Sequence, residues 1–348
     1  MATEFSISPE KQASIPRFFY HQITYKPVEV SGVSLEGKIA IVTGSNTGVG
    51  FETSCQLLDL GLTKLILAVR NEDNGKAAAA KLLARTNSTK VAPVVEVWNL
   101  DLSVYDSIVA FTEKTKSLER LDFVVLNAGI GPAKHQLNQC TGHEECIQVN
   151  YLSTALLAVL LLPVVKSKRS NQPQPSRITF VLSECAAWTS FKQKKEASIL
   201  TALDNPQPGK ADMLDQMFIS KLLGQFFIAH LAKVVPPSVA LINSTSPATV
   251  HDSEFNREHD KTTSGAIAKR ATKLYGNKAS IAARMVTDAV VNHGEETHGK
   301  FLSFQKIVPM APIIYTPEGE AIRERLWEET VSELSFAKVE DVLGGLGK

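Results

Sequence analysis

The sequence predicts an α/β protein built on a single doubly wound parallel sheet, with helices on both faces. Three observations lead to this fold class. Short apolar runs alternate with helical segments along most of the 348 residues. The connections between them are short, as in repeated strand–helix units. A glycine-rich turn also joins the first apolar run to the next helical segment, where the backbone must turn tightly.

Each expected strand is a short run of mostly aliphatic and β-branched residues, as in strands buried on both faces. These runs are 39–44, 64–69, 94–100, 122–127, 177–183, 239–244 and 299–304. Helical spacing predicts helices at 49–60, 74–85, 106–116, 142–165, 213–233 and 317–335. Residues 1–36 show no strong periodicity and are expected to form an N-terminal extension. Residues 37–348 then form one domain, with an insertion at about 186–212.

Composition excludes several classes of function. Lys and Arg number 37 against 36 Asp and Glu, so no strong field favours nucleic acid. The longest apolar run, 155–165, is 11 residues long and contains Pro163, which is too short to span a bilayer. The N-terminus does not resemble a secretory signal. The four cysteines form no C-x-x-C pair and suit a reducing compartment. We therefore expect a cytoplasmic protein without a membrane span or metal.

The glycine-rich turn has the features of a dinucleotide-binding site in a Rossmann-type sheet. It consists of Gly44, Ser45, Asn46, Thr47, Gly48, Val49 and Gly50. Glycine permits the tight turn, the close approach of backbone to phosphate, and the packing of helix on strand. The helix N-terminus then presents N–H groups and a positive dipole end to a pyrophosphate. An ordinary glycine-rich turn is the alternative.

Arg70 ends the second apolar run and favours NADP(H) over NAD(H). An acid near this position would accept hydrogen bonds from a ribose 2′-hydroxyl, whereas a guanidinium can clamp a 2′-phosphate. The neighbouring Glu72 and Asp73 oppose this interpretation. The alternative is a solvated surface arginine.

Further motifs follow in a fixed order. They are Asp101 and Leu102 after the third strand, Asn127, Ala128 and Gly129 after the fourth, Asn150 in QVNYLST, Ser183 in VLSE, Lys221 in ISKLL and Pro247 after the sixth. Together with the T-G-x-x-x-G-x-G turn, they resemble the short-chain dehydrogenase/reductase family over about residues 36–250. The segments FFYHQITYKP and NLDLSVYDSI further resemble the longer fungal members, many of which act in secondary metabolism.

The resemblance implies a role for each matching residue. Ser183 would hydrogen-bond the substrate oxygen, and Lys221 would hold the nicotinamide ribose. Asn150 would seat a water that links Lys221 to solvent. Asp101 would face the adenine, while Pro247 would lie beside the nicotinamide.

This sequence departs from the family at three positions. Met217 stands where the family has the tyrosine of a Tyr-x-x-x-Lys pair. Gln216 precedes it where the fungal members commonly have arginine, and Ala248 replaces a glycine beside the nicotinamide. A thioether carries no exchangeable proton, so Met217 cannot act as the general acid, a role worth typically ~10²–10⁴-fold in rate.

Three functions remain open. The first is an NADPH-dependent reductase of a hydrophobic small molecule that uses another donor, or a substrate that needs none. Its candidate donors are Glu184, His251, Asp252 and Lys221 through water. The second is a non-redox cyclase or isomerase on the same scaffold. The third is a cofactor-binding pseudoenzyme.

Two further expectations concern packing. Trp188 and Phe191 in the insertion either wall the substrate pocket or pack the insertion onto the domain. The apolar helices 142–165 and 213–233 match the family's dimer-forming helices, so a homodimer or homotetramer is compatible with all three functions. The alternative is that both helices only cover the sheet.

Overall fold

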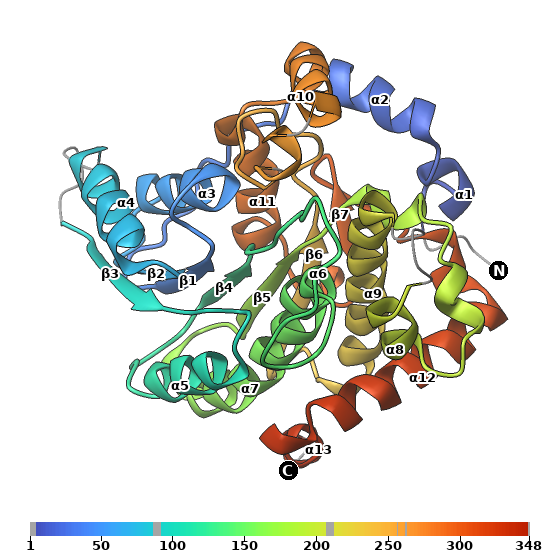
Figure 1. The fold of residues 1–348 in the computed structure, drawn as a ribbon. Helices are drawn as coiled ribbons and strands as arrows, with labels where there is room; N and C mark the ends of the chain where they lie inside the picture. The colour runs from blue at the N-terminus through green and yellow to red at the C-terminus, as the bar shows by residue number, and fades with distance from the viewer. Residues whose placement is uncertain (1–4, 86–91, 207–211, 256, 262, 347–348) are drawn as a thin grey trace.

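The computed structural model describes residues 5–85, 92–206, 212–255, 257–261 and 263–346. Its centre is one eight-stranded sheet in the order β3-β2-β1-β4-β5-β6-β7-β8 (Figure 1). The strands are β1 Ile39–Thr43, β2 Lys64–Val69, β3 Val94–Asn99, β4 Phe123–Leu126, β5 Ser176–Val181, β6 Ala240–Thr245, β7 Phe301–Ser303 and β8 Lys306–Val308. All neighbouring strands pair in parallel except β7 and β8. The predicted fold class is confirmed.

Helices cover both faces of this sheet. They are α1 Pro9–Gln12, α2 Ile15–Thr24, α3 Gly48–Asp59, α4 Glu72–Arg85, α5 Tyr105–Thr115, α6 Glu145–Ile147, α7 Ser153–Ser167, α8 Ile199–Asp204, α9 Met213–Val234, α10 Thr263–Tyr275, α11 Ala279–Val291, α12 Pro317–Glu333 and α13 Val339–Gly344. Helices α3, α4 and α11 pack on one face, and α5, α7 and α9 on the other. Helices α12 and α13 form an outer layer over α9 and α7.

The strand order places the site. Strands β1 and β4 are neighbours, yet the chain leaves β1 toward β2 on one side and later returns to β4 on the other. Loops that follow the two strands therefore diverge and leave a crevice beyond their carboxyl ends, where open α/β sheets bind ligands. The central strands β1 and β4 are buried along their whole length, as their apolar sequences predict.

Within the expected N-terminal extension, residues 15–24 are helical. These residues form α2, with Ser14 at the N-cap and Pro16 in the first turn. Phe18 and Gln22 are its buried residues and lie one helical turn apart on one face. The pattern is inconspicuous because one of the two buried residues is polar.

In the described part of the chain, two helices are long and apolar enough to cross a membrane, Glu145–Ser167 and Met213–Val234. Their apolar windows are 89% and 61% buried within the molecule, which is the behaviour of core helices. The first is not one regular α-helix. A π-helical turn at Gln148–Leu152 separates α6 from α7, and π-turns are frequent at functional sites.

Candidate cofactor and active site

The turn between β1 and α3 has the geometry of a phosphate-binding loop. Gly44 and Gly48 have φ angles of +62° and +60°, which favour glycine. A Cβ on Gly50 would lie 2.5 Å from Asn127 Nδ2, so this position has no room for a side chain. Among the described residues, no side chain caps α3 at its N-cap, Thr47. The first N–H groups of α3 can therefore bind an anion.

Thr43 and Asn127 join the carboxyl ends of β1 and β4. Thr43 Oγ1 accepts hydrogen bonds from the backbone N–H groups of Asn127 and Ala128, at 3.0 and 2.9 Å. The Asn127 side chain donates to the carbonyls of Thr43 and Gly44, at 2.9 and 3.2 Å. The glycine turn and the Asn127–Gly129 segment are thereby fixed relative to each other.

Two other predicted cofactor residues lie at neighbouring strand ends. Arg70 directly follows β2 and is exposed, while its carbonyl accepts a hydrogen bond from Asn99. Asp101 follows β3, and its Oδ1 accepts from the N–H and the hydroxyl of Ser103. Both residues thus follow strands that lie on the same side of β1 in the sheet.

Lys221 is buried at the carboxyl end of β5. Its Nζ donates to the carbonyl of Val181 at 3.1 Å, two residues before Ser183. Burial lowers its pKa, because desolvation disfavours the charged amine. The Ser183 hydroxyl accepts from the N–H of Cys185 at 3.2 Å. The structure therefore brings Ser183 and Lys221 to one strand end.

Asn150 lies within the π-helical turn and bridges two elements. Its Oδ1 accepts from Ile130 N–H at 2.8 Å, and its Nδ2 donates to Ile130 C=O at 2.9 Å. Nδ2 also approaches Ser220 Oγ at 3.1 Å. The loop after β4 is thereby tied to the residue next to Lys221.

Met217 is partly buried one helical turn before Lys221, so both side chains lie on the same face of α9. Gln216 points elsewhere, because its amide donates to Glu144 and to the carbonyl of Leu203. Gln216 therefore ties α9 to α6 and α8.

Two of the candidate proton donors already have structural partners. Glu184 is buried and accepts hydrogen bonds from the hydroxyls of Ser246 and Ser303, while burial raises its pKa. Asp252 accepts from the N–H of Ala279 at 2.7 Å, at the start of α11. His251 pairs through its backbone with Asn277. His251 and Lys221 are the remaining candidates, and Lys221 is the one placed at the end of β5.

Phe255 belongs to this site, although no sequence pattern pointed to it. The Lys221 Nζ lies 5.7 Å from the centroid of the Phe255 ring. A Cβ on Gly129 would lie 3.3 Å from the same ring. Ser253 approaches the glycine turn, since its Cβ would be 3.4 Å from a Cβ on Gly48. The segment after β6 therefore reaches back over the crevice.

The two aromatic residues of the insertion have different environments. Phe191 is 2% exposed in the main core, near Phe226, so it packs the insertion onto the domain. Trp188 is partly buried and lies edge-on to Phe18 and to Phe218, with ring centroids 5.1 and 6.0 Å away. Trp188 therefore joins the N-terminal extension to the residue that follows Met217.

Comparisons with known proteins decide the family. Residues 38–191 match the family model described as short chain dehydrogenase. The short-chain dehydrogenase fogG of Aspergillus ruber is 43% identical over 352 residues, covering 100% of both chains. The chain belongs to the short-chain dehydrogenase family. The short chain dehydrogenase/reductase mfmJ of Annulohypoxylon moriforme is 40% identical, covering 94% of this chain and 93% of that protein.

Solved structures of short-chain dehydrogenases show the same fold. The RhlG/NADP active-site complex of Pseudomonas aeruginosa has a TM-score of 0.59 at 20% identity, covering 78% of this chain and 98% of that one. An NADPH-bound short chain oxidoreductase of Pseudomonas aeruginosa PAO1, described as containing an atypical catalytic center, has a TM-score of 0.56 at 19% identity. The match covers 80% of this short-chain dehydrogenase and 97% of the Pseudomonas protein.

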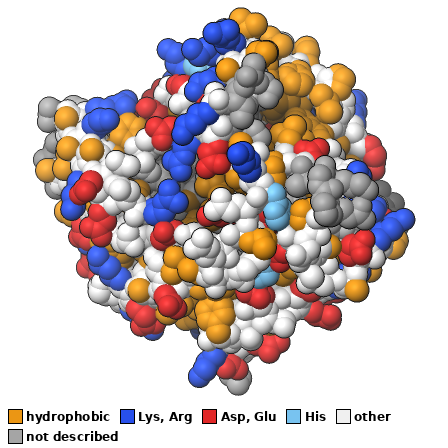
Figure 2. All heavy atoms as spheres, viewed as in Figure 1, with side chains coloured by type: hydrophobic (Ala, Val, Ile, Leu, Met, Phe, Trp, Pro, Cys, Tyr) orange, Lys and Arg blue, Asp and Glu red, His pale blue; other side chains and the backbone are white. Residues whose placement is uncertain are grey.

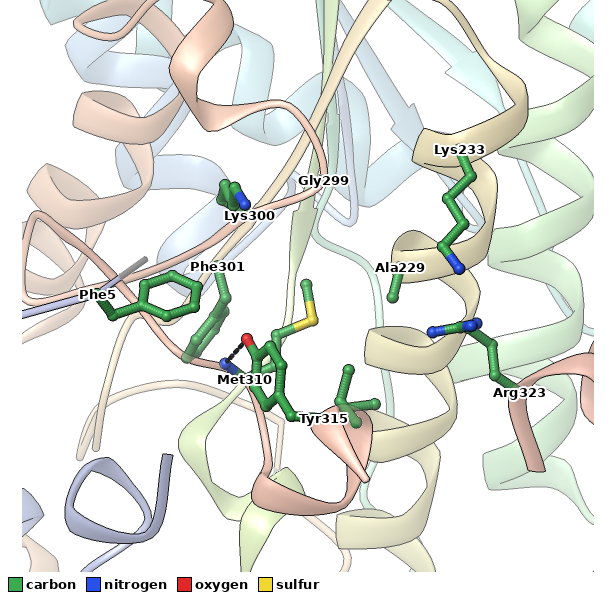
Figure 3. Close-up of a pocket in the computed structure, with 10 residues that line it drawn as sticks. Phe5, Ala229, Lys233, Gly299, Lys300, Phe301, Met310, Tyr315 and Arg323 are labelled. Atoms are coloured by element: carbon green, nitrogen blue, oxygen red, sulfur yellow. Dashed lines mark hydrogen bonds between the residues drawn. The ribbon is translucent and has the colours of Figure 1, made fainter. Parts of the chain in front are cut away.

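A separate cavity of about 230 Å³ lies at the other end of α9 (Figure 3). Phe5, Ala229, Lys233 and Tyr315 are among its lining residues. Ala229 and Lys233 come 12 and 16 residues after Met217 in the sequence. At 1.5 Å per helical residue, this cavity is about 18–24 Å along α9 from Met217. It is therefore separate from the Ser183–Lys221 site.

Proposed function

We propose that this short-chain dehydrogenase is a cytoplasmic NADPH-dependent reductase of a hydrophobic small molecule of the secondary-metabolite type, without the usual tyrosine proton donor. One observation carries the proposal. A phosphate-binding turn follows β1, and Lys221 is buried beside Ser183 at the carboxyl end of β5, which only β4 separates from β1. We assign this role to residues 37–348, with residues 1–36 as an extension.

The cofactor fits the residues that are present. The turn at Gly44–Gly50 would hold the pyrophosphate, because its glycines leave the backbone accessible and a Cβ on Gly44 would lie 2.9 Å from Ala128 Cα. Arg70 would face the 2′-phosphate and Asp101 the adenine, while Lys221 would hold the nicotinamide ribose. Bound NADPH would supply a hydride donor.

The chain's own residues can bind and polarise a substrate oxygen. Ser183 can donate its hydroxyl proton in a hydrogen bond to that oxygen. Lys221, whose pKa is lowered by burial, can release a proton through water more readily than an exposed lysine. Met217 contributes an apolar, polarisable surface. This combination favours a substrate such as an iminium or an activated alkene, in which reduction needs no simultaneous protonation of oxygen.

Isotope transfer tests the reaction. The purified protein is incubated with candidate hydrophobic substrates and NADPH that carries deuterium at the transferable position. Deuterium in the product supports the reductase. Turnover without consumption of cofactor contradicts it and supports a cyclase or isomerase. Binding of NADPH without any turnover supports a pseudoenzyme.

Cofactor choice gives an independent prediction. NADPH should bind more tightly than NADH, and Arg70→Ala should remove most of the difference by deleting the guanidinium opposite the 2′-phosphate. The measurement is the ratio of the two dissociation constants. Arg85→Ala is the matched control, since Arg85 is also exposed but lies at the far end of α4. Equal affinities in the wild-type protein would disprove the role of Arg70.

A non-redox catalyst is the second candidate, and one observation favours it. The carboxylates of Glu184 and Asp252 are engaged by Ser246, Ser303 and Ala279, so neither is positioned to replace the tyrosine. Ser183 and an apolar wall that includes Met217 could still orient a hydrophobic substrate for cyclisation or isomerisation.

A further inference from the structure

The N-terminal extension is attached to loops at the C-terminal edge of the sheet. In Figure 1, α2 lies across the top of the molecule between α10 and α1. Gln305, in the turn between β7 and β8, accepts from Val28 N–H at 2.7 Å and donates to Val28 C=O at 2.9 Å. Trp188 Nε1 donates to Ala13 C=O at 2.9 Å. The extension is therefore held at both ends by residues of the domain.

Gln22 attaches the middle of the extension to the domain. Its Oε1 accepts from Thr249 N–H at 2.9 Å, and its Nε2 donates to the carbonyls of Thr249 and Tyr275, at 3.4 and 3.1 Å. The Gln22 side chain is buried, with 3% of the residue exposed. The Gln22 amide thus pairs with the N–H of Thr249, while the Thr249 carbonyl also accepts from Asn277 N–H at 2.8 Å.

Thr249 begins the segment that covers the crevice. It follows Pro247 and Ala248 after β6, and the chain then runs to Ser253 and Phe255. Ser253 lies against Gly48 of the phosphate-binding turn, and Phe255 lies against Gly129 and Lys221. Gln22 therefore holds the fixed end of a segment whose other end touches both halves of the proposed cofactor site.

Apolar contacts reinforce this placement. Phe18, one turn before Gln22, packs with Met285 and Phe304 in a small cluster that also includes Ala248 and Trp188. Its ring lies 5.1 Å from that of Trp188. The inner face of α2 therefore contacts the loop after β6 and the insertion after Ser183.

We propose that Gln22 is a positioning residue for the cofactor, and that α2 closes the side of the active site between Trp188 and Ala248. Gln22 fixes the backbone at Thr249 and thereby sets residues 247–255 against the nicotinamide half of the cofactor. The adenosine half, bound beyond β1, β2 and β3, does not depend on it. This inference rests on the proposed binding of NADPH.

The test uses Gln22→Met in the full-length protein. Methionine matches glutamine in length and helix propensity but makes neither hydrogen bond to Thr249. Affinity for NADPH should fall about tenfold, as expected for a lost pair of buried hydrogen bonds. Affinity for adenosine 2′,5′-bisphosphate, which lacks both the pyrophosphate linkage and the nicotinamide half, should not change. Amide exchange at residues 248–250 should accelerate.

Ile23→Ala is the matched control. Ile23 neighbours Gln22 on α2 but is 67% exposed, in a region where Figure 2 shows hydrophobic side chains at the surface. The Ile23→Ala substitution should leave the affinities for both ligands unchanged.

The outcomes separate this inference from the proposed function. If the wild-type protein binds adenosine 2′,5′-bisphosphate and NADPH but Gln22→Met weakens neither or weakens both equally, Gln22 has a structural role only and the inference is wrong. If the wild-type protein binds neither molecule, the proposed function itself fails. A lower melting temperature with unchanged NADPH affinity also overturns the inference.

Discussion

Ala248 is an alanine in a backbone conformation that favours glycine. Its φ angle is +56°, and such a left-handed conformation costs an L-residue about 1–2 kcal/mol. Two hydrogen bonds stabilise this turn. Ala248 N–H donates to Ser246 Oγ at 3.0 Å, and the Ser246 hydroxyl in turn donates to the buried Glu184. Glu184, expected as a candidate acid, instead supports the turn.

Replacing this alanine by glycine should therefore change the free energy of unfolding very little. Ala248→Gly should leave the free energy of unfolding within about 0.5 kcal/mol of the wild-type value or raise it, because relief of strain offsets the lost methyl contact and the greater entropy of the unfolded chain. Ala80→Gly, at an exposed position within α4, should lower it by about 1 kcal/mol. Chemical denaturation measures both. Equal losses would show that the turn is unstrained.

Residues in sequential motifs were the easiest to predict. The glycines after β1 and the Asn127–Gly129 segment lie where their order along the chain implied, because each directly follows a strand. Phe255 and Gln22 could not be predicted in this way. Their roles depend on contacts with Lys221 and Thr249. Gln22 and Thr249 are 227 positions apart in the sequence, and no local pattern links them.

At the scale of elements, the insertion is held by charged groups on α12. His143 Nδ1 lies 2.8 Å from Asp204 in α8, and its Nε2 lies 3.2 Å from Glu333 in α12. Tyr105 also donates to Glu333 at 3.2 Å. Burial alone would lower the pKa of His143, but hydrogen bonds with the two carboxylates outweigh burial and raise the pKa to about 9. Charged His143 therefore joins α8 to α12.

This arrangement predicts a pH dependence of stability. The folded pKa of His143 is raised from 6.5 to about 9, so its contribution is complete below pH 6.5 and is lost as the pH rises through about 9. The contribution is at most ~3 kcal/mol. His143→Gln should remove the fall in the free energy of unfolding between these pH values, as measured by urea denaturation.

His230→Gln is the control for this experiment. Burial lowers the pKa of His230, so its effect on the pH dependence should be confined to pH values below about 6.5. A wild-type profile that is flat from pH 6.5 to 9, or one unchanged by His143→Gln, would contradict the prediction.

The sequence predicted elements whose apolar residues form a regular pattern, and it missed several elements whose buried residues form no such pattern. The parallel strands were predicted because each one is a short run of mainly aliphatic and β-branched residues. Helices α10 and α11 and strand β8 were not predicted. Strand β8 is only three residues long and pairs at the sheet edge, and none of the described side chains of α10 is fully buried. Short edge strands and thinly packed helices such as α10 leave too few apolar positions to show a period. This reason does not apply to α11, which is well buried.

At the scale of the whole molecule, the C-terminal helices cover α7 and α9. Trp327 of α12 stacks on His230 and Phe227 of α9, with ring centroids 4.0 and 5.7 Å away. The Tyr151 hydroxyl meets Thr330 Oγ1 at 2.6 Å in a buried contact. The sequence predicted an amphipathic helix at 317–335 but could not show which surface it covers, because amphipathicity identifies a buried face without identifying its partner.

This covering leads to a prediction about assembly. A homodimer or homotetramer formed through α7 and α9 would have to displace α12 and α13, which are buried against them at Leu326, Leu334 and Val339. We therefore expect any oligomer to use another face. Sedimentation over a dilution series should be combined with amide exchange at residues 155–165 and 219–231. Exchange there should stay constant as an oligomer dissociates, because the protection comes from the same chain. If exchange rises in both helices on dilution, they form a subunit interface, and α12 and α13 must move aside in the assembly.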